Sequence, residues 1–374
     1  MRRLSTFRPG GTAGGAGRAM VRELFDYVGI VHLHSLYSHD GRASMEEILQ
    51  AAKKNGIRYL LLTDHSTLDA RRDGWEGWRD GVLVAVGQEI APRFNHYLAF
   101  GIDRTYPVGE EDRPPPESYI DFVNRQGGFG FIAHPDHEGT DVFHVKHYPW
   151  IDWTVKGYSG IGIWDFMTDW QSSLTGTFRA LLSYAAPAFF LRGPRPVTLS
   201  RWDLLNESSK VPGIGELDNH DTEKKVFGVR FPVFPFHRAF RFIRTHVFLR
   251  QPFEGDDGRD LHALLQALRE GRSYVSLDFF ENPEGFRFSV RSNGGEAIPG
   301  EGIPLSGEAR GMVELPARGK IRVVRSGRVF LEETGRSLRF PIGEPGVYRV
   351  EVFLRRFRQW RPWIFSNPVY VRTP

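Results

Sequence analysis

Between residues 28 and 280, short apolar runs alternate with amphipathic segments, and this alternation restricts the fold more than any other feature of the sequence. Runs typical of buried strands include residues 58–63, 82–86, 96–100, 129–133, 160–164 and 211–215. Helical patterns include residues 44–56, 117–126 and 259–270. The first begins with a capping-box pair, Ser44 and Glu47, and the last stops at Gly271. Because strands that alternate with helices are typical of βαβ units, the sequence predicts an α/β fold.

The hydrophobic pattern of the sequence changes near residue 283, and this change divides the chain into two regions. Beyond it, short alternating runs follow one another closely, separated by Gly and Pro turns, which is typical of a small β-sandwich. Residues 1–24 are crowded with glycine and have little to bury. The 374 residues are enough for two domains. We therefore predict a disordered leader over 1–24, an α/β domain over 25–282 and an immunoglobulin-like β-sandwich over 283–374.

The chain has 13 histidines and no cysteine. The lack of cysteine excludes disulfides, thiolate zinc sites, iron–sulfur clusters and a cysteine nucleophile. Any bound metal must therefore be held by imidazole nitrogens and carboxylate oxygens.

Charge and hydropathy limit the partners. The net charge is +4 and there is no dense Lys/Arg block, so we expect a small-molecule substrate and no nucleic acid beyond nucleotides. Residues 1–20 lack the apolar centre of a secretory signal. The most apolar stretch, residues 180–191, is too short to span a bilayer. These features predict a cytoplasmic protein that does not enter a membrane.

Histidine and acidic residues recur at or just after the carboxyl ends of the predicted strands. They are His32, His34, His65, Glu89, His134, Asp218 and His220. In α/β barrels the loops at that end meet at one mouth, where active sites are built. His32 and His34 are two residues apart, as are Asp218 and His220, so each pair points to one face of an extended segment. Such a set of nitrogen and oxygen ligands suits Zn, Mn or Fe.

The order of these motifs resembles that of the polymerase-and-histidinol-phosphatase (PHP) superfamily, over roughly residues 28–280. The motifs are His32-Leu33-His34-Ser35, Ser38-His39-Asp40-Gly41, Thr63-Asp64-His65, Gly87-Gln88-Glu89, His96-Tyr97-Leu98, Ala133-His134-Pro135 and Asp218-Asn219-His220. The resemblance implies a distorted (β/α)7 barrel that holds two or three divalent metal ions.

The resemblance also implies a set of metal ligands. His32, His34, Glu89 and Asp218 would lie near one metal, and Glu89 would bridge to a second. His96 and His134 would serve the second metal, and Asp40, His65 and His220 would serve a third or complete a two-metal site. Many members carry a carboxylate at the position of His39, whereas here the aspartate comes one residue later. Either His39 or Asp40 can be the ligand, and we favour Asp40.

Further segments resemble the carbaryl-hydrolase-like branch, which also places a small β-sandwich after the PHP domain. These segments are Arg192-Gly193-Pro194-Arg195-Pro196, Trp202-Asp203 and residues 360–368. We expect Trp360 and Trp363 to pack the sandwich onto the barrel. A long insertion, residues 135–215, is rich in tryptophan, and we interpret part of it as a lid or pocket wall, although large aromatic residues more often belong to the core.

Several further side chains are weaker candidates. Arg71, Arg72 and Arg195 can grip a phosphate or simply lie on the surface. His137, His144 and His147 can line the mouth of the site or be structural.

These features predict a metal-dependent hydrolase in which a metal-bridging hydroxide is the nucleophile. We expect a phosphoesterase that acts on a small phosphorylated molecule. The alternatives are a carbamate or amide hydrolase of the same branch, and a non-enzymatic binding module with structural metals. The Gly-x-Ser-x-Gly elbow, the Walker loop and the His-Glu-x-x-His helix are all missing from the sequence.

Overall fold

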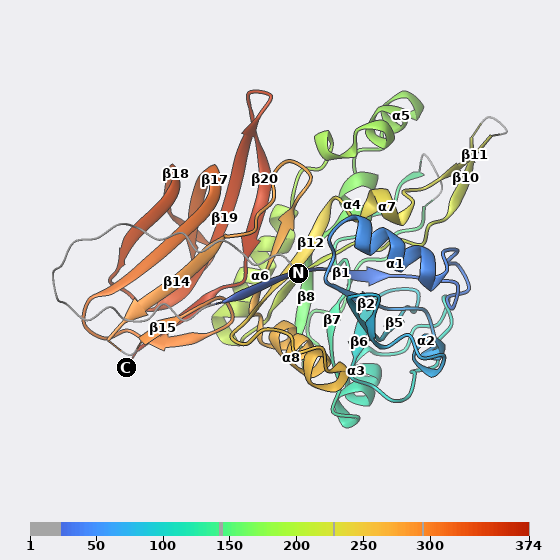
Figure 1. Cartoon of the computed structure of the whole chain (residues 1–374), viewed down its shortest axis with the longest axis horizontal. Helices are drawn as coiled ribbons and strands as arrows, with labels where there is room; N and C mark the ends of the chain where they lie inside the picture. The colour runs from blue at the N-terminus through green and yellow to red at the C-terminus, as the bar shows by residue number, and fades with distance from the viewer. Residues whose placement is uncertain (1–23, 142–144, 227–228, 294, 374) are drawn as a thin grey trace.

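The computed structural model describes residues 24–141, 145–226, 229–293 and 295–373, and it has a mixed α/β part joined to an all-β part (Figure 1). The predicted disordered leader lies outside the described residues, except for Leu24. In the described part of the chain, no helix is both long and apolar enough to cross a membrane.

The first strands of the α/β part are parallel, as the alternation predicts. β1 (Phe25–Leu33) pairs in parallel with β2 (Tyr59–Leu62), and β2 pairs in parallel with β4 (Val82–Val86). The short β3 (Gly77–Arg79) closes this edge in the antiparallel sense. Residues of β2 and β4 are buried throughout, which explains why both strands are continuous apolar runs in the sequence.

The α/β part has a second sheet of five strands, and the residues after its last strand pair with the end of β1. Its strands are β5 (Gln88–Ile90), β6 (Tyr97–Phe100), β7 (Phe129–Ile132), β8 (Gly160–Asp165) and β9 (Gly213–Glu216). The pairs β5–β6 and β6–β7 are antiparallel, whereas β7–β8 and β8–β9 are parallel. Two isolated bridges, Leu33–Asn219 and His65–Glu89, join the two sheets. The carboxyl ends of β1, β2, β7 and β9 therefore lie close together.

The predicted helices form with the expected caps. α1 (Met45–Lys54) begins with the reciprocal Ser44–Glu47 capping box, and α3 (Pro116–Arg125) matches the second helical pattern. α8 (Asp257–Glu270) ends at Gly271, whose φ of 75° suits glycine. The remaining helices are α2 (Asp69–Arg72), α4 (Phe166–Gln171), α5 (Thr177–Ala185), the 3-10 turn η2 (Pro187–Phe189), α6 (Pro196–Ser208) and α7 (Phe236–Ala239).

Two core strands were not predicted, β12 (Ile243–Leu249) and β13 (Ser273–Leu277). β12 pairs antiparallel with both β1 and β13. Polar residues interrupt the apolar pattern of both strands. These polar side chains are buried because they pair with residues far away in the sequence. His246 on β12, for example, lies 2.9 Å from Asp26 and 3.4 Å from Asp278.

The all-β part begins after a loop that contains the predicted boundary at residue 282. Its strands are β14 (Arg287–Ser292), β15 (Gly295–Ala297), β16 (Gly302–Pro304), β17 (Ala309–Arg325), β18 (Arg328–Ile342), β19 (Gly346–Arg356), β20 (Gln359–Ser366) and β21 (Val369–Arg372). β17 and β18 are longer than the short runs expected. These strands enclose a core of their own, which includes Phe288, Val323 and Trp363. β20 also pairs antiparallel with β13, so one sheet continues from the α/β part into the all-β part.

The segments that resemble the carbaryl-hydrolase-like branch lie at the junction between the two parts. Arg349 on β19 forms two hydrogen bonds, at 2.6 and 2.7 Å, to the carboxylate of Asp203 on α6. The side chain of Asn367 accepts from the Gly213 amide at 2.7 Å and donates to its carbonyl at 2.9 Å. The β10–β11 hairpin (Glu223–Val226 and Val229–Pro232) is a separate two-stranded sheet that projects from the α/β part (Figure 1).

Candidate metal centre

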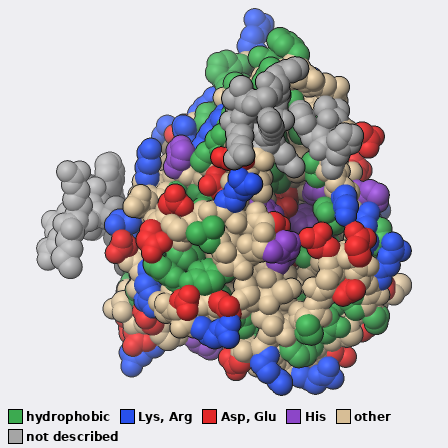
Figure 2. Space-filling model, turned by 90° about the vertical axis from the view of Figure 1, so that its right-hand side faces the viewer, with side chains coloured by type: hydrophobic (Ala, Val, Ile, Leu, Met, Phe, Trp, Pro, Cys, Tyr) green, Lys and Arg blue, Asp and Glu red, His purple; other side chains and the backbone are tan. Residues whose placement is uncertain are grey.

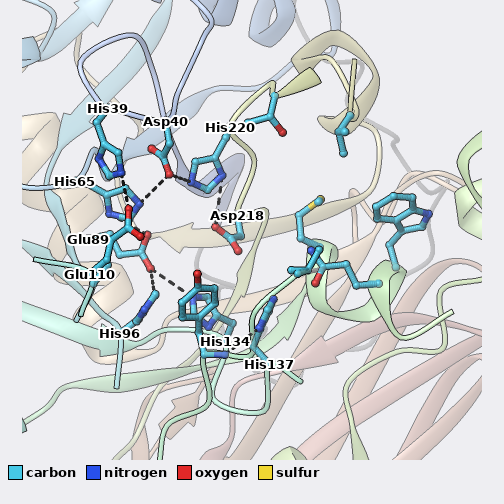
Figure 3. Close-up of a pocket in the computed structure, with 18 of the residues that line it drawn as sticks. His39, Asp40, His65, Glu89, His96, Glu110, His134, His137, Asp218 and His220 are labelled. Atoms are coloured by element: carbon cyan, nitrogen blue, oxygen red, sulfur yellow. Dashed lines mark hydrogen bonds and ion pairs between the residues drawn. The ribbon is translucent and has the colours of Figure 1, made fainter. Parts of the chain in front are cut away.

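The structure brings all nine predicted ligand residues together at the carboxyl ends of the α/β strands. They form three overlapping groups, in each of which the ligand atoms lie within 4.8 Å of one another. The groups are His34, Asp40, His65 and His220; His32, His34, Glu89 and Asp218; and Glu89, His96 and His134. Figure 3 shows seven of the nine side chains labelled around one cavity.

Glu89 stands at the centre of the cluster. Its Oε2 lies 3.0 Å from His32 Nε2 and 3.2 Å from His34 Nε2. Its Oε1 lies 2.8 Å from His96 Nδ1 and 3.3 Å from His134 Nε2. The two oxygens of one buried carboxylate therefore face different pairs of histidines, which is the geometry of a group that can bridge two cations.

The structure places Asp40, rather than His39, in the cluster. Asp40 Oδ2 lies 3.4 Å from His65 Nε2 and 3.2 Å from His220 Nε2. The His39 side chain is 57% exposed and pairs with Glu110 at 2.9 Å. His39 lines the same cavity but is absent from the three ligand groups.

The backbone is bent where the central ligands leave their strands. His32, His134 and Asp218 have φ values of 68°, 25° and 50°, in the left-handed region that non-glycine residues rarely adopt. The β1–β2 register also shifts between Val31 and Leu33. His32 and His34 face one centre because of this irregularity, and not because they alternate along a regular strand. Backbone strain of this kind concentrates at functional sites.

The donor set fits divalent metal ions. Within the described residues, the buried His65 Nδ1 and His134 Nδ1 have no hydrogen-bond partner, and His34 Nε2 makes only the 3.2 Å ion-pair contact with Glu89 Oε2. A buried polar atom without a partner is costly, and a cation would compensate it. Imidazole together with carboxylate suits Zn, Mn and Fe alike.

The carboxylates set the protonation of the cluster. Burial alone lowers the pKa of His65, but Glu89 and Asp40 raise it to about 9. Burial likewise lowers the pKa of His134, and Glu89 and Asp218 raise it to about 9. The pKa of His34 is lowered to about 3, because the ring is buried and lies beside His220 and His65. Cation binding at this cluster therefore competes with protons for the same nitrogens.

Sequence reasoning missed a fourth buried carboxylate, Glu216 at the end of β9. Its Oε2 lies 3.0 Å from His32 Nδ1, and its Oε1 accepts the backbone N–H of His134 at 2.9 Å. The signal was present, because Glu216, Asp218 and His220 follow one another at alternate positions. Asp165, at the end of β8, was also missed; burial and the nearby Asp218 and Glu216 raise its pKa to about 7.

A cavity of about 650 Å³ opens beside the cluster. Of the ligand residues, it is lined by Asp40, His65, Glu89, His96, His134, Asp218 and His220. Figure 2 shows several histidine side chains close together on this face, next to acidic ones. Trp170 and His137 also line the cavity, as the sequence reading allowed, whereas His144 lies outside the described residues.

The other candidates do not reach the cavity. Arg71 donates to the carbonyls of Ile102 and Val86 at 2.6 Å, and Arg195 pairs with Glu138 at 2.6 Å. Arg72 pairs with Asp69 on the surface, and His147 is exposed outside the cavity lining. Trp150 and Trp164 are core residues.

Comparisons with known proteins agree with the motif order. Residues 31–123 match the model of the PHP domain family. An uncharacterised protein of Methanocaldococcus jannaschii is 30% identical over 146 residues, which cover 31% of this chain and 81% of that protein. A probable histidinol-phosphatase of Thermotoga maritima is 28% identical over 116 residues, which cover 25% of this chain and 46% of that protein.

The chain thus spans less than half the length of the Thermotoga protein. Among solved structures, endonuclease Q in complex with a 27-mer duplex that has an abasic lesion at the active site matches with a TM-score of 0.39 and 11% identity, over 66% of this chain and 56% of that one. That similarity is too low to bear on function. The α/β part matches the family model, and the Methanocaldococcus relative is matched over 81% of its length at 30% identity. The chain therefore belongs to the PHP domain family.

Proposed function

We propose that this protein is a metal-dependent hydrolase, and specifically a phosphoesterase that acts on a small phosphorylated molecule. The observation that carries the proposal is the central Glu89, whose two oxygens face separate histidine pairs beside an open cavity. A closed structural metal site would have no such opening. The cavity therefore favours an enzyme over a binding module with structural metals.

The nine clustered residues would hold two or three divalent ions of Zn, Mn or Fe. When bound, such ions supply an activated water at neutral pH and charge stabilisation for an in-line displacement. Glu89 would bridge two of the ions, and Asp40 would complete the group that includes His65 and His220.

Two residues outside the ligand set would orient the reacting groups. Glu216 Oε2 accepts a hydrogen bond from His32 Nδ1 and leaves His32 Nε2 directed at the cluster. His137 accepts the Tyr148 backbone N–H at Nδ1, at 3.3 Å, so its neutral ring carries its proton on Nε2. We propose that this N–H, which lines the cavity beside Gln171, donates to an oxygen of the substrate.

The finer architecture is also a proposal. We assign the two joined sheets of residues 25–282 to a distorted (β/α)7 barrel, and residues 283–374 to an immunoglobulin-like β-sandwich. The bridges Leu33–Asn219 and His65–Glu89 support closure of the barrel. Membership of the carbaryl-hydrolase-like branch is proposed from the sequence resemblance of residues 192–196, 202–203 and 360–368.

A second function, hydrolysis of carbamates or amides, is favoured by one observation. Among the described residues that line the cavity there is neither lysine nor arginine. A substrate with further phosphate groups would find no counter-charge there apart from the metals. A neutral carbamate or amide has no such requirement.

The test is a substrate screen on protein stripped of metal and reloaded with Mn or Zn. The panel contains phosphomonoesters, cyclic phosphodiesters and aryl carbamates, and each is tested on the wild type and on His32→Ala. We expect metal-dependent turnover of a phosphoester, with loss of both bound metal and activity in the variant. Turnover of carbamates alone would select the second function. Unchanged activity in His32→Ala would refute the assignment of the site.

A further inference from the structure

The cavity is much larger than the reacting group needs. Its volume of about 650 Å³ lies within the range of pockets that enclose whole small molecules. In Figure 3 the labelled histidine and acidic side chains are grouped together, and unlabelled side chains continue the lining away from them. That continuation comes from α4, from the loop that follows it, from α5 and from the segment after β11. Its large side chains are Met167, Trp170, Leu174, Leu181, Tyr184 and Val233.

The polar atoms of the two large aromatic residues of this wall are already engaged elsewhere, whereas Gln171 on α4 also lines the cavity and its Oε1 has no hydrogen-bond partner. The indole N–H of Trp170 donates to Ser183 Oγ at 3.2 Å, and the hydroxyl of Tyr184 donates to the carbonyl of Pro232 at 2.7 Å. Arg238 lies nearby, with its guanidinium 4.5 Å from the centre of the Tyr184 ring, but it donates to the carbonyls of Tyr184 and Ala185. The wall therefore presents rings and aliphatic groups to the cavity, without hydrogen-bonding atoms from these two aromatic residues.

The charges that line the cavity are acidic, from Asp40, Glu89, Glu110 and Asp218, or belong to histidines. An anionic group on the far side of the substrate would find no lysine or arginine among the described lining residues, only neutral polar ones such as Gln171 and Thr177, so the loss of its water is unfavourable. An uncharged apolar group would instead gain from the removal of its surface from water.

We propose that the wall formed by α4 and α5 is the leaving-group subsite, and that it selects esters whose leaving group is an uncharged aryl or branched alkyl alcohol. The inference rests on the proposed function. Hydrolysis forms a bond from the water oxygen to phosphorus, or to the acyl carbon in the second function, and breaks the bond to the leaving-group oxygen. That oxygen keeps the electron pair and takes the proton that the water gives up. The released alcohol is the product that the apolar wall holds.

α5 supplies a matched pair of positions for the test. Leu181 lines the cavity although its side chain is 51% exposed, so a polar replacement is compatible with folding. Leu182 is 46% exposed on the same helix and does not line the cavity. Leu181→Asp and Leu182→Asp therefore make the same chemical change at similar exposure, and they differ in contact with the cavity.

The experiment compares kcat/KM for the phenyl and glycerol esters of the same phosphoryl group, in the metal-loaded wild type and in both variants. The ratio between the two esters is compared across proteins, because this cancels their different intrinsic reactivity. We expect Leu181→Asp to lower the phenyl-to-glycerol ratio on the order of tenfold, the scale of a changed apolar contact, and Leu182→Asp to leave it unchanged. Aryl and glycerol carbamates provide the same comparison if phosphoesters are not turned over.

A binding measurement separates this inference from the proposed function. Calorimetric titration of 4-tert-butylphenol, a neutral apolar alcohol, needs no turnover. We expect it to bind the wild type and Leu182→Asp, and to bind Leu181→Asp more weakly. Equal binding to all three proteins, or an unchanged ester ratio in Leu181→Asp, would overturn the subsite. Absence of metal-dependent hydrolysis, with phenol binding still sensitive to Leu181→Asp, would overturn the proposed function and leave the apolar subsite standing.

Discussion

Replacement of Glu216 by glutamine tests whether this carboxylate positions the metal ligands. Glu216 is fully buried and uses both oxygens, one facing His32 Nδ1 at 3.0 Å and the other the His134 amide at 2.9 Å. Glutamine has one oxygen and one NH₂ group, so it can accept from only one of these neighbours. If it accepts from the His134 amide, its NH₂ faces His32 Nδ1 and moves the ring proton to Nε2, the nitrogen that faces Glu89. If it accepts from His32, a buried amide hydrogen at His134 has no acceptor.

Either outcome weakens cation binding. Loss of a group that orients a ligand typically costs 10- to 100-fold in metal affinity, or about 1.4–2.7 kcal/mol. The effect on the metal-free protein is expected to be smaller, because removing one negative charge relieves repulsion with Asp165 while the lost hydrogen bond costs about 1–3 kcal/mol.

The assay is a titration of metal-free protein with Co²⁺ or Zn²⁺ at pH 7, followed by calorimetry or absorbance. Thermal unfolding in excess chelator monitors the metal-free state. Glu351→Gln is the control, because Glu351 is equally buried but lies on β19 and pairs with Arg349. Gly162→Ala provides an independent perturbation, since a methyl group at Gly162 would overlap Glu216 Oε1. Metal affinity in Glu216→Gln within about twofold of the wild type would refute the positioning role.

Three further outcomes follow from the structure. Asp40→Asn is expected to lower metal affinity at least about a hundredfold, whereas His39→Gln leaves it unchanged, as measured by metal content after dialysis; equal content in both variants would contradict the choice of Asp40. Arg349→Met leaves the buried Asp203 carboxylate without its partner and is expected to destabilise the protein by about 3–5 kcal/mol in urea unfolding, so a change under about 1 kcal/mol would count against this junction contact. Burial lowers the pKa of His246, but Asp26 and Asp278 raise it to about 9, so its contribution to stability is full below pH about 6.5 and is lost as the pH rises through about 9. That contribution is about 3 kcal/mol; the decline over this pH window should be flatter in His246→Gln, and an identical slope in both proteins would show that His246 is not its source.

Much of the site could be predicted because its residues follow strands that can be recognised from their own local sequence. The runs at β2, β4 and β7 are apolar throughout, and polar side chains mark the point where each ends. The helices were predictable for the same reason, since the Ser44–Glu47 capping box and Gly271 are local signals. Seven of the nine candidate ligands followed from the convergence of strand ends, whereas Asp40 and His96 entered the set only through the resemblance to the PHP superfamily.

Other features depended on partners distant in the sequence. β12 was missed because His246 is acceptable in a core strand only beside Asp26 and Asp278, and no local pattern shows those neighbours. Glu216 was missed because its role is defined by contacts with His32 and His134, 184 and 82 residues away. Which of His39 and Asp40 joins the cluster was equally a tertiary matter, because only the Asp40 carboxylate lies within 3.4 Å of both His65 Nε2 and His220 Nε2.

The sequence by itself determined most of the elements and the residue types of the candidate metal centre, because hydrophobic periodicity, caps and residue type act over a few neighbouring residues. The tertiary structure decided the geometry of the ligand groups, the carboxylate that positions them and the apolar character of the cavity. Those properties arise where Trp170, Leu181 and the histidines are brought together from separate strands and helices, and burial and electrostatic interaction act across that space regardless of position in the chain.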